Sequence, residues 1–151
     1  MRFDVLNQLS AAQVCGTGAT ISTNSIAKKS VSQDLGIGSN PTQMGLAFAP
    51  TVDAAGATSW TIELIEAENG ALSTNVVSLA SMSLLTADLT AGKQYFLPLP
   101  GYKMKSAKTH YGARYTAVGG AGEQLTLDAY FGSADDVANY KSFTSTYSVA
   151  N

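Results

Sequence analysis

His110 is the only histidine in the sequence, and it is the first candidate for catalysis because an imidazole can activate a serine nucleophile. Such a site needs a base that reaches both a nucleophile and an orienting acid. Arg114 and Thr116 share the face of His110 on the expected strand, and the sequence contains no G-x-S-x-G nucleophile motif. We expect His110 to be a surface residue, and a hydrolase built on it stays an alternative.

Carboxylates and glycine-rich segments are the next candidates. A pair of carboxylates could hydrolyse a glycoside, but Glu63 and Glu66 have opposite parity, so a regular strand sends them to opposite faces. We expect Glu66 and Glu68 to be charges at the edge of a turn. The glycine pairs at 16–18 and 36–38 are not followed by the helix that a dinucleotide-binding loop requires, and we expect turns there.

Metal and disulfide chemistry find little support in the sequence. Cys15 is the only cysteine, so no intramolecular disulfide can form. One cysteine and one histidine cannot supply a zinc site, and no calcium-binding loop of the EF-hand type is present. We therefore expect no catalytic residue, no metal and no cofactor, and we expect that the chain is not an enzyme.

Aromatic side chains could instead bind a sugar. Trp60 is the obvious stacking platform, but Ile62 and Leu64 have the same parity, so the face of Trp60 is expected to be core. Tyr111 and Tyr115 share a face with alanines, and that face could be core or an interface. A carbohydrate-binding module, such as an adhesin or accessory protein, stays an alternative that requires Trp60 or Tyr111 to be exposed.

The elements that must position these residues are strands. Apolar and polar residues alternate in short segments bounded by Gly, Pro, Ser, Asn and Asp, which is typical of an all-β sandwich or barrel. The clearest strands are expected at 58–66, 109–118 and 123–131, and weaker ones at 20–26, 44–51, 76–85 and 94–97. We expect the Gly119–Gly122 segment to turn the last two clear strands into a hairpin.

These elements predict one all-β domain. The expected fold is a single antiparallel β-sandwich of jelly-roll type over residues 1–131. Residues 132–151 are expected to form a C-terminal arm, a short helix followed by an extended segment, because Ser133 and Asp136 have the spacing of a helix cap.

The composition narrows the class of partner. Charged residues make up 13% of the 151 residues and the net charge is −2, so a nucleic acid is not expected as the main partner. No apolar run approaches about 18 residues, and the first residues have no apolar signal segment, so we expect neither a membrane partner nor a signal peptide. A weakly charged β-domain without a reactive cluster favours contact with other proteins.

Six segments in a common order and spacing carry a family resemblance. They are Leu9-Ser10-Ala11-Ala12-Gln13, Ser22-Thr23-Asn24-Ser25-Ile26, Asp34-Leu35-Gly36-Ile37-Gly38, Gly56-Ala57-Thr58-Ser59-Trp60-Thr61-Ile62-Glu63-Leu64, Phe96-Leu97-Pro98-Leu99-Pro100 and the segment 111–120. Here the chain resembles the capsid cement (decoration) proteins of tailed phages, typified by the Bordetella podophage cement protein. The resemblance covers Leu6 to Phe131. Gly112 departs from it, where a larger strand residue is expected, and predicts a bulge.

The resemblance implies a structural protein of the virion. It implies a jelly-roll sandwich, a homodimer, and a place on the outer capsid surface, reached after synthesis in the host cytoplasm. The partner it implies is the major capsid (coat) protein, whose neighbouring subunits the dimer would bridge without catalysis. Another virion component, such as a head–tail joining protein, stays an alternative.

Two groups of residues are expected to make the protein contacts. One is a loop that combines aromatic, flexible apolar and cationic side chains, which suits an acidic coat surface: Tyr102, Lys103, Met104 and Lys105. The other is the set of aromatic residues in the expected arm, which could lie over a neighbouring subunit: Tyr140, Phe143 and Tyr147.

Overall fold

The computed structural model describes residues 7–27, 44–99 and 108–134, and this part of the chain forms one antiparallel sheet of seven strands. The strands are β1 (Gln8–Cys15), β2 (Ala19–Ile21), β3 (Ile26–Ala27), β4 (Met44–Ala67), β5 (Val77–Leu85), β6 (Tyr95–Pro98) and β7 (His110–Ser133). A short 3-10 helix, η2 (Thr86–Asp88), follows β5. The expected all-β antiparallel fold is confirmed.

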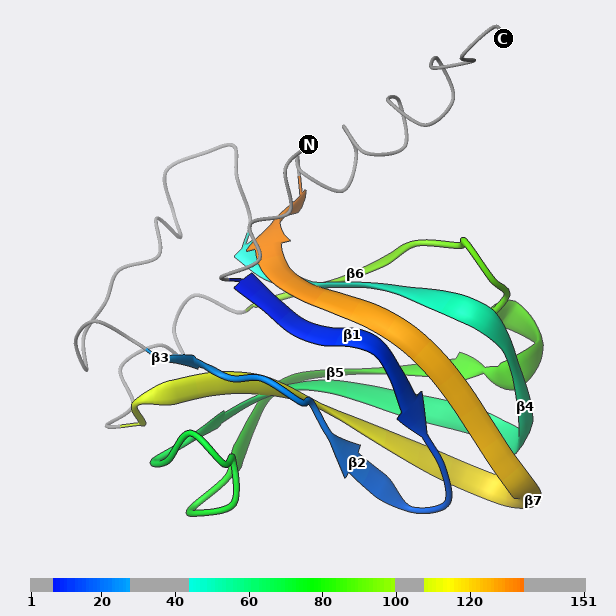
Figure 1. Cartoon of the computed structure of the whole chain (residues 1–151), viewed down its shortest axis with the longest axis horizontal. Helices are drawn as coiled ribbons and strands as arrows, with labels where there is room; N and C mark the ends of the chain where they lie inside the picture. The colour runs from blue at the N-terminus through cyan, green and yellow to red at the C-terminus, as the bar shows by residue number, and fades with distance from the viewer. Residues whose placement is uncertain (1–6, 28–43, 100–107, 135–151) are drawn as a thin grey trace, which may run out of the picture.

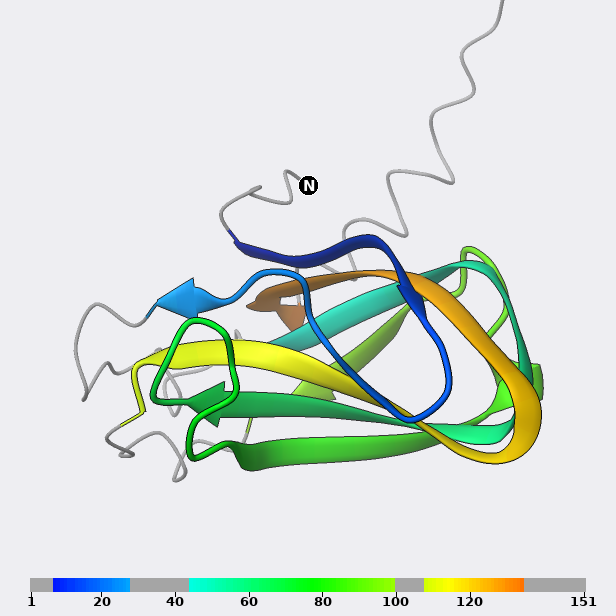
Figure 2. The same ribbon diagram turned by 60° about the horizontal axis from the view of Figure 1, so that its bottom comes forward.

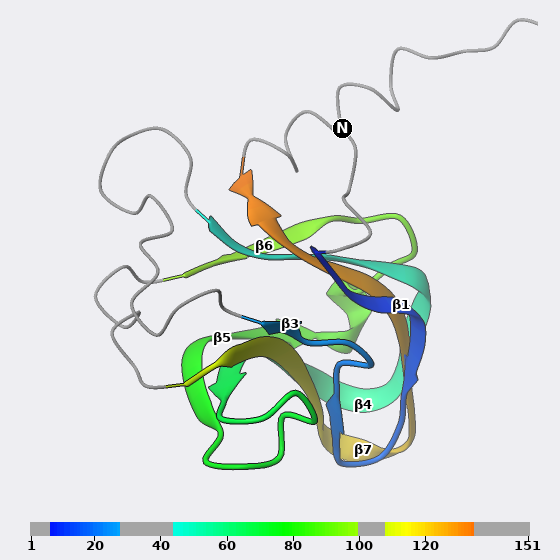
Figure 3. The ribbon, with the colours of Figure 1, turned by 60° about the vertical axis from the view of Figure 1, so that its left-hand side comes forward.

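The two long strands, β4 and β7, pair with each other along most of their length and bend together into two layers (Figures 1 and 2). The first half of β4 and the second half of β7 lie in one layer, flanked by β6 and β1. The other halves lie in the second layer, flanked by β5 on one side and by β2 and β3 on the other. Figure 3 shows β6 and β1 on one side of the interior and β5 and β3 on the other.

Close glycine packing makes this bend. Gly56 of β4 and Gly120 of β7 have φ of +81° and +93°, a backbone conformation that L side chains rarely adopt. A Cβ at Gly120 would lie 1.9 Å from the carbonyl oxygen of Gly56, so the two backbones touch. The register between the strands shifts three times between Pro50 and Ala57, which sharpens the bend.

The expected hairpin over the last two strands is wrong, because residues 110–118 and 123–131 belong to the single strand β7. The glycines between them bend the strand, and each half continues its pairing with β4 instead of pairing with the other half. Likewise 44–51 and 58–66 are one strand, β4. Pro50 does not end a strand. It lies where the β4–β7 register begins to shift, and proline, which has no backbone N–H to donate, is tolerated at such irregular positions.

The expected strand 20–26 is interrupted. Residues Ala19–Ile21 and Ile26–Ala27 pair separately with β7, and β1 precedes them without having been expected. The β1–β7 register shifts twice, and Ala12 has φ of +42°, so the apolar residues of β1 do not alternate.

The core lies between the layers. It contains the inward-facing residues of both layers. Fully buried side chains are Leu46 and Leu127 in the first layer and Trp60, Ile62 and Leu64 in the second. Ser10 of β1 and Tyr115 of β7 share a buried hydrogen bond, with their hydroxyl oxygens 2.9 Å apart. β7 extends to Ser133, and the rest of the expected arm, residues 135–151, lies outside the described residues.

Candidate interaction surfaces

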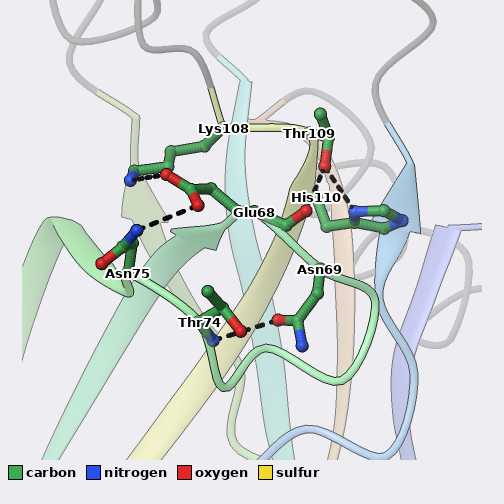
Figure 4. Close-up of polar contacts among 7 residues, drawn as sticks. All are labelled: Glu68, Asn69, Thr74, Asn75, Lys108, Thr109 and His110. Carbon is green, nitrogen blue, oxygen red and sulfur yellow. Dashed lines mark hydrogen bonds and ion pairs between the residues drawn. The ribbon is translucent and has the colours of Figure 1, made fainter.

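His110 lies at the start of β7 beside the loop that follows β4 (Figure 4). Thr109 Oγ1 donates to the carbonyl oxygen of Glu68 over 2.8 Å and lies 2.9 Å from His110 Nδ1. Because the threonine proton is used on Glu68, Nδ1–H must be the donor to Thr109. A hydroxyl therefore occupies the place where a catalytic triad has its carboxylate.

A serine close to this ring, Ser25, donates its hydroxyl proton to another group. A Cβ built on Gly70 would lie 3.5 Å from both His110 Nε2 and Ser25 Oγ, so these two groups flank the same glycine. Ser25 Oγ donates to the carbonyl oxygen of Gly70 over 2.8 Å. The geometry of the described residues gives no support to a hydrolase built on His110.

The segment from Glu68 to Val76 is a tightly bonded surface loop (Figure 4). Asn69 Oδ1 accepts from the backbone N–H groups of Ser73 and Thr74 at 3.0 and 3.1 Å. The Glu68 carboxylate accepts from Asn75 Nδ2 and forms a 2.9 Å ion pair with Lys108. The Lys108 hydrogen bond is the main cause that lowers the pKa of Glu68. Hydrogen bonds within the loop and an ion pair with Lys108, just before β7, therefore support its shape.

Leu72 anchors this loop to the outer face of the second layer. Its side chain is 2% exposed and packs with Ile65 and Ala67 in a small cluster separate from the main core. A Cβ at Gly112 would lie 2.0 Å from Leu72 Cδ1, so the glycine makes room for the leucine. The bulge expected at Gly112 is wrong: the β4–β7 register passes through it unshifted.

The glutamates of β4 separate as their parity predicts. Glu63 lies on the outer face, where Arg114 Nε and Nη2 bind its two carboxylate oxygens at 2.5 and 2.9 Å. This hydrogen-bonded pair lowers the pKa of Glu63 and raises that of Arg114. Glu66 faces inward and is 1% exposed, so its expected place at a turn edge is wrong, whereas Glu68 is exposed beyond the strand.

The aromatic residues considered as sugar platforms are buried. Trp60 is 0% exposed and Tyr111 2%, and the Tyr111 ring stacks on Phe131 with centroids 5.3 Å apart. Burial, with a smaller contribution from the Glu66 charge, raises the pKa of Tyr111 to about 12. These positions give a carbohydrate-binding module no exposed ring, and the core interpretation of Trp60 is confirmed.

Cys15 is likewise inside the protein. Burial raises the pKa of its thiol to about 12, with a smaller opposing effect of a hydrogen bond with Thr20. Within the described ranges, no three His, Cys, Asp or Glu residues gather as metal ligands. None of the helical segments there has the length and hydropathy to cross a bilayer.

The described residues present a hydroxyl-rich sheet face and a sheet edge, that of β5, along which no further described strand pairs. Ser59, Thr61, Ser81, Ser83 and Thr116 share the outer face of the second layer, as their cross-strand pairing shows. At the edge of that layer β5 pairs with β4, and no other described strand pairs with it. Neither feature could be read from the sequence, because both depend on the order of strands in the sheet.

The expected contact residues lie outside the described residues. They are Tyr102, Lys103, Met104 and Lys105 of the loop and Tyr140, Phe143 and Tyr147 of the arm. They stay predictions. Lys108, the neighbour of that loop, is described and is paired with Glu68.

A comparison with known proteins gives the family. The chain has no match among the curated proteins. The family model Bbp16 matches residues 9–129, a range that begins in β1 and ends in β7 and so takes in all seven strands. Because the match covers most of the sequence, the chain belongs to the Bbp16 family, which is named after a Bordetella phage protein.

Proposed function

We propose that this chain is a capsid cement protein, which binds the outer surface of a mature phage capsid as a homodimer and stabilises the coat lattice. The observation that carries the proposal is the family match over residues 9–129 to a family named after a phage protein. The weak charge of the chain, 13% charged residues, suits a protein that acts by contact with other protein surfaces.

The order of the strands supports a jelly roll as the finer description of the fold. With each half of β4 and β7 counted as a strand, and β2 with β3 as one, the described residues form eight strand segments. One layer then reads β6, first half of β4, second half of β7, β1. The other reads β5, second half of β4, first half of β7, β2 with β3. Every step along the chain except that from β4 to β5 crosses between the two layers, which is the pattern of jelly-roll domains.

The stabilisation of the shell by a cement protein would follow from thermodynamic linkage between binding and stability. A protein that binds the mature shell more tightly than the immature shell or free coat subunits stabilises the mature shell by that difference in affinity. A dimer adds a second effect, because the second half is already close to its site once the first half has bound. Each contact can then be of ordinary size, about 800 Å² per partner.

The proposal is tested with virions that lack the protein. Mass spectrometry of purified particles should find the chain in the wild-type virion, and cryo-EM of the shell should place it on the outer surface. Particles without it should release DNA at a lower temperature, and added protein should restore wild-type resistance, because the bound dimers hold neighbouring coat subunits together.

The same images separate the alternatives. Density for this chain at the head–tail vertex alone would indicate a joining protein, and its absence from assembled particles would contradict a role in the virion. A heat-denatured sample of the same protein is the control for restoration, because it has the composition without the fold.

A further inference from the structure

The edges of the sheet differ in how they are protected from pairing with another strand. An exposed edge presents unpaired backbone N–H and C=O groups, and proteins commonly blunt it with short strands, proline, bulges or charge. β6 has four residues and ends at Pro98, and β2 and β3 have three and two residues. β1 carries two register shifts and a positive φ at Ala12.

β5 has none of these features from Ala80 to Leu85. It contains neither proline nor a charged residue, and its register with β4 is regular over this stretch. Ser81 and Ser83 are exposed on the outer side and Leu85 is 58% exposed, while Met82 and Leu84 on the inner side pack against the core and remain partly exposed. This stretch is therefore suited to pair with another neutral strand.

We propose that the dimer forms by antiparallel pairing of β5 with β5 of a second copy, centred on Ser83. The inference rests on the proposed function for the dimer itself and adds the surface that makes it. A second copy is the partner that the edge fits, because an antiparallel pair of identical strands closes on a two-fold axis and leaves no further edge free on β5.

Centring the pair on Ser83 places each Met82 opposite the partner's Leu84. The partly exposed apolar side chains of the two inner faces then cover one another, and the neutral hydroxyls of Ser83 meet on the outer face. The two second layers join into one continuous sheet across the dimer. Pairing about Ser83 uses only Ser81 to Leu85 of each copy.

The first test introduces a charge on this edge. Sedimentation of the wild-type chain between about 1 and 100 µM should show a dimer, and Ser83→Lys should raise its dissociation constant at least about tenfold, because two lysines would face each other. Val14→Lys is the matched control: Val14 is 69% exposed on β1 and away from the proposed contact, so its dimer should be unchanged. Circular dichroism and the unfolding midpoint should show both variants folded.

The second test reads the register. Directly opposed residues of an antiparallel pair have Cβ atoms about 4.5–5.5 Å apart, close enough for a disulfide with small adjustment. Ser83→Cys should therefore cross-link under mild oxidation, and Ser81→Cys, which would face the partner's Leu85, should not. Cys15 is buried and does not compete.

Three results would overturn the inference: a monomeric wild-type chain throughout the range, an intact dimer in folded Ser83→Lys, or cross-linking through Ser81→Cys in preference to Ser83→Cys. The proposed function fails separately. If the β5 dimer forms as described while the wild-type chain does not bind capsids, the pairing stands and the cement role does not.

Discussion

At the scale of single residues, the Glu63–Arg114 pair should make stability depend on pH in the acid range. The hydrogen bonds from Arg114 hold the pKa of Glu63 below its ordinary value of 4.5 in the folded protein. Its contribution is therefore present above about pH 4.5 and is lost as the pH falls through the folded pKa. We expect Glu63→Gln to lower the free energy of unfolding by about 0.5–1 kcal/mol at pH 7, a modest amount because solvent screens a surface pair.

Urea unfolding between pH 7 and pH 3 measures this effect. The difference between wild type and Glu63→Gln should shrink as the pH falls through the folded pKa of Glu63, since protonated Glu63 and glutamine are equally neutral. Asp88→Asn is the control, because Asp88 is exposed and makes no ion pair among the described residues. A Glu63→Gln difference that stays constant over the whole pH range would contradict the ion-pair explanation.

Gly112 gives a second prediction at this scale. Gly112→Ala should cost about 1–3 kcal/mol, because the new methyl group would overlap Leu72 Cδ1, only 2.0 Å from the Cβ position. The cost should fall below about 1 kcal/mol in a Leu72→Ala background, where the overlapping atom is gone. Equal costs in both backgrounds, measured by a double-mutant cycle in urea, would exclude this contact as the reason for the glycine.

Parity along a strand predicts which face a residue occupies, and at this scale it did so correctly for Trp60, Ile62, Leu64 and the opposition of Glu63 to Glu66. It does not predict what covers the outer face. Leu72 lies in a loop and reaches Gly112 across the sheet, a contact between distant parts of the chain that no local pattern carries.

At the scale of elements, the bend of β4 and β7 depends on glycine. Gly120→Ala should cost more than about 3 kcal/mol or prevent folding, because its Cβ would lie 1.9 Å from a backbone oxygen that cannot rotate away. Gly18→Ala is the matched control: its φ is +85°, but nothing lies within 4 Å of the added Cβ. It should cost only the strain of that backbone conformation, about 1–2 kcal/mol.

Urea unfolding of the two variants measures the difference. If Gly18→Ala destabilised the protein as much as Gly120→Ala, positive φ alone would explain the glycines, and close backbone packing at the bend would not be needed.

The same glycines explain why strand content was predictable and strand continuity was not. Alternation correctly located the residues that form strands around 44–51, 58–66, 109–118 and 123–131. A run of glycines can reverse a chain or bend it, and which occurs depends on whether a partner strand continues alongside. Here β4 continues beside β7, and its own Gly56 meets Gly120, so the pair bends. β1 was not predicted, because its two register shifts interrupt the alternation of apolar and polar residues.

At the scale of the whole molecule, the all-β fold class and the phage-related family were predictable from the sequence, and the arrangement of the sheet edges was not. Low charge and the lack of a reactive motif can be read from composition and sequence alone, and they favoured a protein that acts by contact with other proteins. Which strand lies at an edge is a property of the strand order, and the order β1-β7-β4-β5 arises from pairings between residues far apart in the chain. The β5 edge could therefore be recognised only in the folded sheet.

The C-terminal arm makes the last prediction at this scale. Gly132 and Ser133 pair with Gly45 and Met44, so the natural cut is after Ala134, where β7 has ended. Deleting residues 135–151 should leave the free energy of unfolding within about 0.5 kcal/mol of wild type, since every described strand is retained, and should reduce capsid occupancy by removing Tyr140, Phe143 and Tyr147.

Sedimentation of capsids with the truncated chain measures the occupancy. A full-length chain with these three aromatic residues changed to serine separates contact by the rings from contact by the backbone of the arm, and it should bind as weakly as the truncation. Because the β5 edge is intact in both variants, they should still dimerise, so a loss of capsid binding with the dimer retained assigns the arm to the coat. Undiminished occupancy in the truncated chain would remove the arm from the capsid contact and leave the described domain and residues 100–107 to provide it.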